Sequence, residues 1–297
     1  MRLVYLGAIC VFTILNISIW YASHADVMKI ERMWRRVSVD GTNSTYQPGN
    51  TIRRDGESPI FNKMMTEMIE LEKKQVSARQ SKLRGPTGYA DLFGSLGTEV
   101  LCPEKVRIGV MGDGGKWMCN PWKIPDDCTV VSLGLNNQVD FDTSLQGLLN
   151  NRCKLFGYDA DEQTADTQEK YKKLNGKTRK AFITTIKNET AHQYTIEDLM
   201  ELDGVKDVEI LKIDIEGAEK TALIPFLQKY TVCQIIIEVH GRANEHSSLL
   251  NKIAKQQYRL FSYEVNGFDM AACEYSFIHE TCVDKYGGKR IVNYLDF

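Results

Sequence analysis

Leu211-Lys-Ile-Asp-Ile-Glu-Gly-Ala-Glu219 decides the fold, because it joins the end of an apolar strand to the start of a helix. Side chains alternate between the two faces of a strand, so Lys212, Asp214 and Glu216 are predicted to lie on one side of it. The residues around them are apolar: Val208, Ile210, Leu211, Leu223 and Ile224. Three charges at the buried end of a strand are costly without partners or a ligand. We therefore interpret this segment as part of a functional site.

Strand and helix patterns alternate on both sides of this stretch. The predicted strands are 129–133, 154–158, 181–186, 207–213, 232–239, 258–265 and 274–280, and the predicted helices are about 141–149, 162–174, 218–229 and 247–257. Strands that alternate with helices form a parallel sheet with right-handed crossovers. The last two strands follow each other directly, which predicts an antiparallel hairpin. The fold class is therefore α/β.

In open α/β sheets, ligands bind at the carboxyl ends of the strands. The first predicted strand ends in the small-residue turn 132–137, which contains Gly134. The second ends in Asp159, 25 residues later, near the place where an acidic residue contacts a ribose in nucleotide-binding folds. The fifth ends in Glu238 and His240. The strand ends thus predict a nucleotide-like site with an acid–base pair beside it.

Residues 3–22 contain no charged side chain and are long enough to cross a bilayer. They predict a signal anchor over residues 1–22, or a signal peptide cleaved near Ala25. A stem over 23–90 follows, with a helix at about 58–83, and then the main domain, 91–297. The predicted location is the secretory pathway, as a single-pass membrane protein with a luminal domain in the Golgi or the endoplasmic reticulum, or as a secreted protein after cleavage.

The eight cysteines and two glycosylation tripeptides, Asn43-Ser-Thr and Asn188-Glu-Thr, agree with that location. Seven cysteines lie outside the apolar segment, which allows three disulfides with one thiol left over. No pair has the C-x2-C spacing of a zinc site, so no metal is predicted. The seven are Cys102, Cys119, Cys128, Cys153, Cys233, Cys273 and Cys282.

Composition excludes other classes of protein. Hydrophobic residues make up 43% of the 297 residues and charged residues 26%, which is typical of a globular chain rather than a disordered one. The net charge is −2, but residues 85–297 hold 24 basic and 31 acidic side chains, a local charge of −7. Phosphate backbones require clustered Lys and Arg, so nucleic acid is not a predicted partner.

The motifs resemble those of the FkbM-type S-adenosylmethionine-dependent methyltransferases. The resemblance covers roughly residues 100–282, and its most specific motif is the run from Lys212 to Glu219. Val131-Ser-Leu-Gly-Leu135 and Tyr158-Asp159 belong to it as well. Arg107-Ile-Gly and Asp113-Gly-Gly-Lys-Trp117 are similar to the entry motif of a secretory methyltransferase-like branch.

The resemblance implies a Rossmann-like sheet of seven strands, the last one antiparallel, with S-adenosylmethionine as cofactor. The implied reaction is methyl transfer, often to a hydroxyl of a glycan, lipid or protein. Gly134 and Asn136 would lie against the methionine part of the cofactor, and Asp159 would bind the ribose. The methyl-transfer pocket would contain Asp214, with Glu216, Glu238 and His240 as acid–base or orienting groups. The family's glycine-rich turn is reduced here to Gly134 followed by Asn136 and Asn137.

Two other functions remain possible on the sequence. Asp159-Ala160-Asp161 matches the D-x-D motif with which Golgi glycosyltransferases hold Mn²⁺ and a sugar nucleotide. That interpretation leaves the run from Lys212 to Glu219 without a role. The reduced glycine turn also fits a methyltransferase fold that binds without catalysis. The acceptor molecule is not predicted by the sequence.

Overall fold

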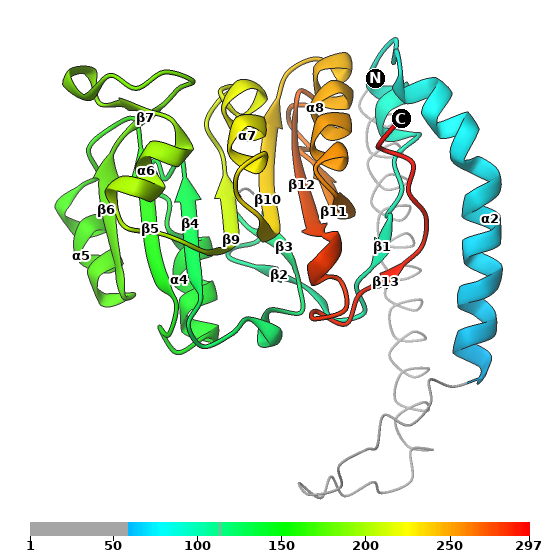
Figure 1. Cartoon of the computed structure of the whole chain (residues 1–297), viewed down its shortest axis with the longest axis horizontal. Coiled ribbons are helices and arrows are strands. Elements are labelled where there is room, and N and C mark those ends of the chain that lie inside the picture. Colours follow the sequence, from blue (N-terminus) through cyan, green and yellow to red (C-terminus); the bar gives the residue numbers. More distant parts are fainter. Residues whose placement is uncertain (1–58, 113) are drawn as a thin grey trace, which may run out of the picture. The chain divides into compact units, whose positions relative to one another are not determined.

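The computed structural model describes residues 59–112 and 114–297, and a seven-stranded sheet forms its centre (Figure 1). The strand order is β11-β12-β10-β9-β4-β5-β6. All neighbouring strands are parallel except β12, which is antiparallel to both β10 and β11. The bounds are β4 Thr129–Leu133, β5 Lys154–Asp159, β6 Gly176–Lys180, β9 Val208–Ile213, β10 Val232–His240, β11 Tyr258–Val265 and β12 Ala272–His279. The predicted α/β, Rossmann-like sheet with an antiparallel last strand is confirmed.

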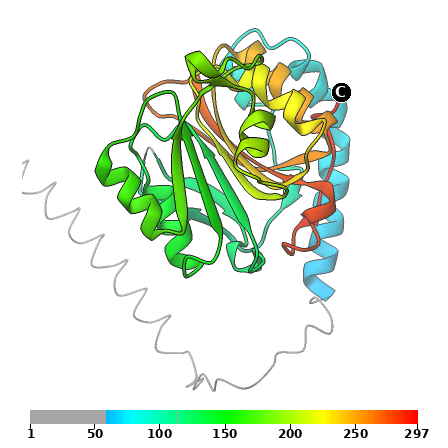
Figure 2. The same ribbon diagram turned by 60° about the vertical axis from the view of Figure 1, so that its left-hand side comes forward.

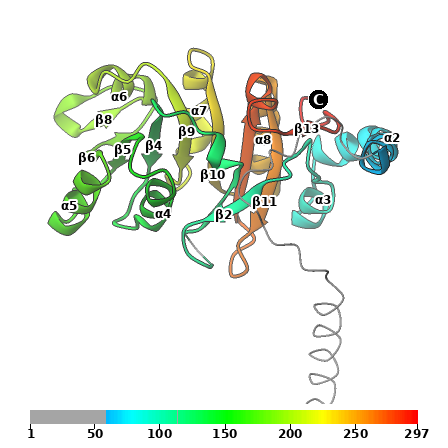
Figure 3. The ribbon, with the colours of Figure 1, turned by 90° about the horizontal axis from the view of Figure 1, so that it is seen from below.

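Helices cover both faces of the sheet (Figures 2 and 3). One face carries α6 (Ile196–Leu202), α7 (Glu219–Leu227) and α8 (Ala243–Lys255), and the other carries α4 (Asp140–Leu148) and α5 (Ala165–Lys173). Alternation along β4 divides its side chains between the two layers: Val131 and Leu133 pack in the core with α6–α8, and Val130 packs in the core with α4. Because both faces are covered, the central strands are almost entirely apolar, as parallel sheets require.

The third predicted strand, 181–186, is a strand only at Phe182–Ile183, and it is not part of the central sheet. The sheet instead uses the polar segment Gly176–Lys180, which pairs with β5. As an edge strand β6 has only one neighbour, and charged side chains such as Lys177 and Arg179 are tolerated there and protect the edge. The apolar run that follows leaves the sheet, and its β7 (Phe182–Ile183) pairs with β8 (Gln193–Tyr194). A short 3-10 turn, Glu189–Ala191, lies between them.

A β-hairpin that the sequence analysis did not predict lies against the sheet on the α4 side (Figure 3). It consists of β2 (Lys105–Ile108) and β3 (Lys116–Cys119), which pair antiparallel. β3 packs on β10, β11 and β12, and β2 packs on α4. The hairpin therefore takes the place that a helix has on the other half of this face. It is followed by a 3-10 turn, Pro121–Lys123.

The helix predicted at 58–83 is present as α2 (Pro59–Leu83), and its C-terminal end packs on the main domain. Arg79 Nη1 donates to Ser95 O at 2.9 Å, and Ser247 Oγ donates to Leu83 O. The short helix α3 (Tyr89–Phe93) follows. Contacts group residues 58–297 into one compact unit, so no separation into stem and domain is visible near residue 90.

The N- and C-terminal ends of the main domain meet in a short strand pair. β1 (Val100–Leu101) pairs with β13 (Lys289–Arg290), which follows the 3-10 turn Glu280–Cys282. The buried carboxylate of Glu99 accepts hydrogen bonds from the backbone N–H groups of Tyr294, Leu295 and Leu260. Burial raises the pKa of Glu99, and these bonds oppose the shift. The last residues are thereby attached to the sheet.

In the part of the chain that the structure describes, three disulfides form and one thiol stays free, as predicted. Cys102 pairs with Cys119, Cys128 with Cys153, and Cys233 with Cys282, with Cα–Cα separations of 5.7, 4.6 and 5.5 Å. The free cysteine is the buried Cys273. The first disulfide joins the end of β3 to the segment just before β2, and therefore closes the base of the hairpin.

The predicted location, a luminal domain on a single-pass membrane anchor, is corrected here. Within residues 59–112 and 114–297, no helix is both long and apolar enough to cross a bilayer. The segment predicted to do so, 3–22, lies outside the described residues, as does Ala25. The single-pass location therefore has no support in the structure and is withdrawn.

A group of ion pairs around one buried carboxylate joins the end of α6 to the edge of the sheet. The carboxylate of Asp203, whose side chain is 1% exposed, accepts hydrogen bonds from Tyr158 and Arg179, and Lys177 Nζ lies 2.7 Å away. Burial alone would raise the pKa of Asp203, but its partners outweigh burial and lower the pKa to about 2. A carboxyl whose pKa is lowered in the folded state stabilises the fold above its unfolded pKa, and this contribution is lost as the pH falls through the folded value.

We expect Asp203→Asn to lower the free energy of unfolding by about 2 kcal/mol at pH 7, which corresponds to the pKa shift. The difference between wild type and variant should shrink as the pH falls from about 4 to about 2, because the wild-type carboxylate then becomes protonated. Urea unfolding at several pH values measures both effects. Asp126→Asn, at a side chain that is 97% exposed, is the control and should change little. A difference that stays constant over this pH range would contradict the assignment.

Candidate active site

A cavity of about 570 Å³ opens at the carboxyl ends of β4, β5, β9 and β10. Ligand pockets typically have volumes of about 300–1,000 Å³, and this edge of an α/β sheet is where they form. The structure brings together every site residue that the sequence predicts, and all of them line this cavity: Gly134, Asn136, Asp159, Asp214, Glu216, Glu238 and His240.

The turn after β4 requires glycine at its first position. Gly134 has φ +78°, and a Cβ atom placed there would lie 1.6 Å from the backbone oxygen of Asp214. Only a residue without a side chain permits this approach between the ends of β4 and β9. Lys212 Nζ donates to Gly134 O at 2.6 Å, which holds the turn from below.

In the rest of the turn, asparagines adopt the left-handed backbone conformation that is usually adopted by glycines. Asn136 and Asn137 have φ values of +45° and +57°, in the left-handed region that asparagine tolerates better than most residues. Asn137 N donates to Gln163 Oε1 at 2.8 Å, and Asn137 Oδ1 accepts from Thr164 N at 2.9 Å. The reduced glycine pattern therefore still forms an ordered, compact turn.

Asp159 supports this turn as well as lining the cavity. Its Oδ2 accepts hydrogen bonds from the backbone N–H groups of Leu135 and Asn136, both at 2.7 Å. Its Oδ1 accepts from Asp161 N at 2.8 Å. A carboxylate has about four acceptor positions, so roughly one remains for a ligand hydroxyl.

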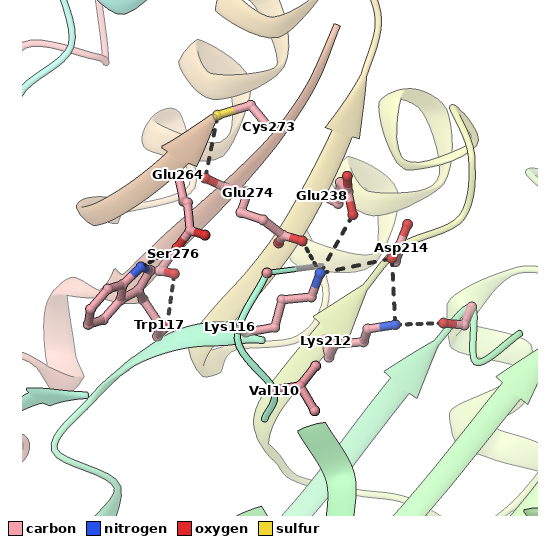
Figure 4. Close-up of polar contacts among 12 residues, drawn as sticks. Val110, Lys116, Trp117, Lys212, Asp214, Glu238, Glu264, Cys273, Glu274 and Ser276 are labelled. Carbon is pink, nitrogen blue, oxygen red and sulfur yellow. Dashed lines mark hydrogen bonds and ion pairs between the residues drawn. The ribbon is translucent and has the colours of Figure 1, made fainter. Parts of the chain in front are cut away.

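Lys116, from β3, lies at the centre of the cavity's acidic side, as Figure 4 shows. Its side chain is 1% exposed, and its Nζ lies 3.6 Å from Glu238 Oε2, 3.9 Å from Asp214 Oδ2 and in direct contact with Glu274 Oε1. The three carboxylates come from β10, the end of β9 and β12. The ammonium thus compensates acidic groups from three adjacent strands.

Polar contacts hold β3 in the position that delivers this lysine. The amide of Gln234 on β10 binds both backbone groups of Cys119, at 2.9 and 2.8 Å. Ser276 Oγ donates to Trp117 O at 2.8 Å, and Trp117 Nε1 donates to Glu264 Oε2 at 2.6 Å (Figure 4). Together with the Cys102–Cys119 disulfide, these contacts place Lys116 before any ligand binds.

The ammonium of Lys212 contacts other groups of the protein, so its role is structural rather than catalytic. Besides its bond to Gly134 O, its Nζ lies 3.9 Å from Asp214 Oδ2. Beneath it, Ser132 Oγ donates to the buried Asp142 carboxylate at 2.5 Å. Burial raises the pKa of Asp142, and the Ser132 hydrogen bond and the Lys212 charge oppose that shift. Lys212 thus stabilises the turn and the acidic groups around it.

His240 is the last residue of β10 and lines the cavity. Its Nε2 is 3.6 Å from Glu216 Oε2 and 3.7 Å from Glu238 Oε1, while its buried Nδ1 has no hydrogen-bond partner among residues 59–112 and 114–297. Glu216 is 83% exposed and has φ +52°. The buried Glu219 accepts from the backbone N–H groups of Gly217 and His240 and so fixes both loops. Glu219 is therefore a positioning residue of the motif.

Asp214, Glu238 and His240 offer ligand atoms within 4.8 Å of one another, a spacing that a metal ion accepts. However, the Lys116 ammonium already lies within 4 Å of both carboxylates. A divalent cation between them would meet strong repulsion from this buried positive charge. The arrangement therefore favours an organic cofactor and acid–base chemistry.

Sequence reasoning missed Lys116 and Glu274 as parts of the site. Lys116 belongs to the Asp113–Trp117 motif, and the glycines of that motif were the feature of the sequence that could have indicated its role. Asp113 itself lies outside the described residues. Glu274 lies on β12, 158 residues from Lys116. Nothing in the local pattern of either segment indicates that the two side chains meet.

Comparison with known proteins places the chain in a family. The profile of a family described as a methyltransferase domain matches residues 60–279. No curated protein matches the chain. The match covers most of the described residues, including the whole cavity.

Several solved structures are similar in part. M. capricolum TrmK in complex with S-adenosyl-homocysteine has a TM-score of 0.34 at 10% identity, covering 54% of this chain and 66% of that chain, just under two thirds. Aeropyrum pernix fibrillarin with bound S-adenosyl-L-methionine has a TM-score of 0.36 at 8% identity, covering 60% and 84%. The E. cuniculi Mtq2-Trm112 complex has a TM-score of 0.30 at 15% identity, covering 52% and 86%. At these scores, the assignment to a family rests on the profile match.

We expect Gly134→Ala to destabilise the protein, because the new Cβ would meet the Asp214 carbonyl and the residue would keep an unfavourable positive φ. The loss should be at least about 2 kcal/mol, measured by urea unfolding. Gly147→Ala is the matched control, since nothing lies within 4 Å of that position inside α4. It should leave stability unchanged or raise it by up to about 1 kcal/mol. Equal effects at the two glycines would contradict the close approach.

Proposed function

The chain belongs to the methyltransferase domain family, and we propose that it transfers the methyl group of S-adenosylmethionine to a hydroxyl of an acceptor molecule. The chain carries a methyltransferase domain, for which S-adenosylmethionine is the predicted cofactor. That the chain belongs to the FkbM-type branch and that its acceptor is a hydroxyl are more specific than the family match, and both are proposals. The observation that carries them is the convergence of Gly134, Asp159, Asp214 and His240 on one cavity.

The residues of the cavity fit this cofactor. Its volume suits a nucleoside with an amino-acid side arm, and the turn at Gly134 lets backbone approach a ligand closely. In the proposed arrangement Gly134 and Asn136 bind the methionine part, and the remaining acceptor position of Asp159 binds one ribose hydroxyl. Asp214 and Glu238 supply negative charge, which suits a cationic sulfonium. The bound cofactor would supply an activated methyl group.

The protein contributes alignment and a proton acceptor. Methyl transfer is an in-line displacement, so holding the two reactants in line supplies much of the rate enhancement. A hydroxyl acceptor must lose its proton as the new carbon–oxygen bond forms. His240 is the better placed base, because Nε2 faces the carboxylates of Glu216 and Glu238, which stabilise the imidazolium. Asp214, which lies beside two ammonium groups, orients the acceptor in this proposal.

Two kinds of experiment test the proposal. Calorimetry compares S-adenosylmethionine with UDP-sugars plus Mn²⁺, the ligands of the glycosyltransferase interpretation. Formation of S-adenosylhomocysteine is then measured with hydroxyl-, amine- and carboxylate-bearing acceptors. Binding of S-adenosylmethionine with turnover on hydroxyl acceptors supports the proposal, whereas binding without turnover on any of them favours a non-catalytic binding protein.

Asp159→Ala should weaken S-adenosylmethionine binding about tenfold to a hundredfold, the scale of a hydrogen bond to a charged group. Because Asp159 also supports the turn, Gln163→Ala serves as the control: it removes the acceptor of Asn137 N but no cavity-lining side chain. Calorimetry on both variants separates the two roles. An equal loss in both would assign the effect to the turn and remove Asp159 from the ribose site.

Asp214→Asn should leave the melting temperature almost unchanged, because this carboxylate is partly exposed and keeps its shape as an amide. Methyl transfer should fall by about two orders of magnitude or more, the usual scale for groups that orient or exchange protons. Thermal unfolding and S-adenosylhomocysteine formation measure the two effects. A strongly destabilised variant with normal turnover per folded molecule would show that Asp214 only forms a structural ion pair.

A further inference from the structure

Five charged side chains form one group at the acidic side of the cavity, which we call the charge cluster. It contains two ammonium groups and three carboxylates: Lys116, Lys212, Asp214, Glu238 and Glu274. With every member ionised, the cluster carries a net charge of −1. Four of the five line the cavity, whereas Glu274 does not line it and contacts Lys116 Nζ (Figure 4). The cluster is therefore one positive charge short of neutrality.

This imbalance has a strong effect because the cluster is largely buried. Charges interact several times more strongly near a low-dielectric interior than in water. Lys116 cannot withdraw from the carboxylates, since the contacts of Gln234, Ser276 and the Cys102–Cys119 disulfide hold β3 in place. The potential at the cavity wall is therefore a fixed property of the fold, and Lys116 limits how negative it becomes.

We propose that the charge cluster is a charge-selective subsite that favours the sulfonium of the cofactor over the neutral thioether of the product, and that Lys116 determines how strongly. This inference rests on the proposed function, because it takes S-adenosylmethionine as the ligand. In the transfer the sulfur–methyl bond breaks and its electron pair stays on sulfur, so the sulfonium loses its charge. The acceptor oxygen gains the methyl group, and its proton passes to His240 Nε2.

The cluster thus distinguishes the two ends of the reaction by charge alone. Before transfer, the sulfonium supplies the missing positive charge. After transfer, and once His240 has released its proton to solvent, the thioether does not supply it, and the product is held less tightly. Without Lys116 the cluster would carry an excess of two negative charges and would bind the cationic cofactor more tightly. Lys116 therefore determines how much more tightly the site binds the cofactor than the product.

The test is the ratio of two dissociation constants, S-adenosylhomocysteine over S-adenosylmethionine, measured by calorimetry on the full chain. Lys116→Met keeps an unbranched side chain, shorter by one atom, but removes its charge and should raise the ratio about tenfold or more. Glu274→Gln removes a carboxylate that contacts the lysine and should lower the ratio about threefold, since it does not line the cavity. The double variant restores the net charge of −1 and should return the ratio toward the wild-type value.

Lys105→Met is the matched control on the same hairpin. Lys105 Nζ lies 4.7 Å from the centre of the Trp117 ring and does not line the cavity, so the ratio should not change. A purely structural role for Lys116 would lower both affinities together and leave their ratio constant, and that result would overturn the inference. If Lys116→Met fails to fold, a ratio in Glu274→Gln within twofold of wild type overturns it equally. A wild-type protein that binds neither ligand would instead defeat the proposed function itself.

Discussion

The contact between the Lys116 ammonium and three carboxylates is the interaction on which the site depends. Asp214, Glu238 and Glu274 come from three adjacent strands, and without a buried cation their mutual repulsion would be severe. The lysine comes from a hairpin outside the sheet, so the ion contacts attach that hairpin to the strands while they set the charge of the cavity. The same few atoms therefore determine both how firmly the hairpin is attached to the sheet and how negative the cavity is.

The second constraint is geometric and lies in the turn after β4. The backbone there passes so close to Asp214 that only glycine fits at position 134, while Asn136 and Asn137 adopt the left-handed conformation farther along. Asp159 then uses three of its acceptor positions to hold this turn. The turn thus keeps its conformation with fewer glycines, because side chains, including the Asp159 carboxylate, form hydrogen bonds to it. The side of the turn that faces the ligand stays open.

The accuracy of the sequence predictions follows burial. Strands covered on both faces, such as Val208–Ile213 and Val232–His240, consist of apolar residues and were predicted within one or two positions. The edge strand Gly176–Lys180 was missed, because one free edge allows it to be polar and it then looks like a loop. The hairpin of β2 and β3 was missed because its two strands are four residues long and pack across the sheet rather than within it.

By itself, the sequence determined the α/β class, the strand that ends in Lys212–Glu219, and the candidate residues at the strand ends, because parallel strands all bring their carboxyl ends to one edge. Only the tertiary structure decided which charges meet. Lys116 and Glu274 are 158 residues apart, and Arg107 and Glu264 are 157 apart. No local periodicity records such pairs, since they arise from the way the hairpin packs on the finished sheet. The physical reason is that secondary structure depends on neighbouring residues, whereas the electrostatics of a cavity depends on all the groups that the fold brings around it.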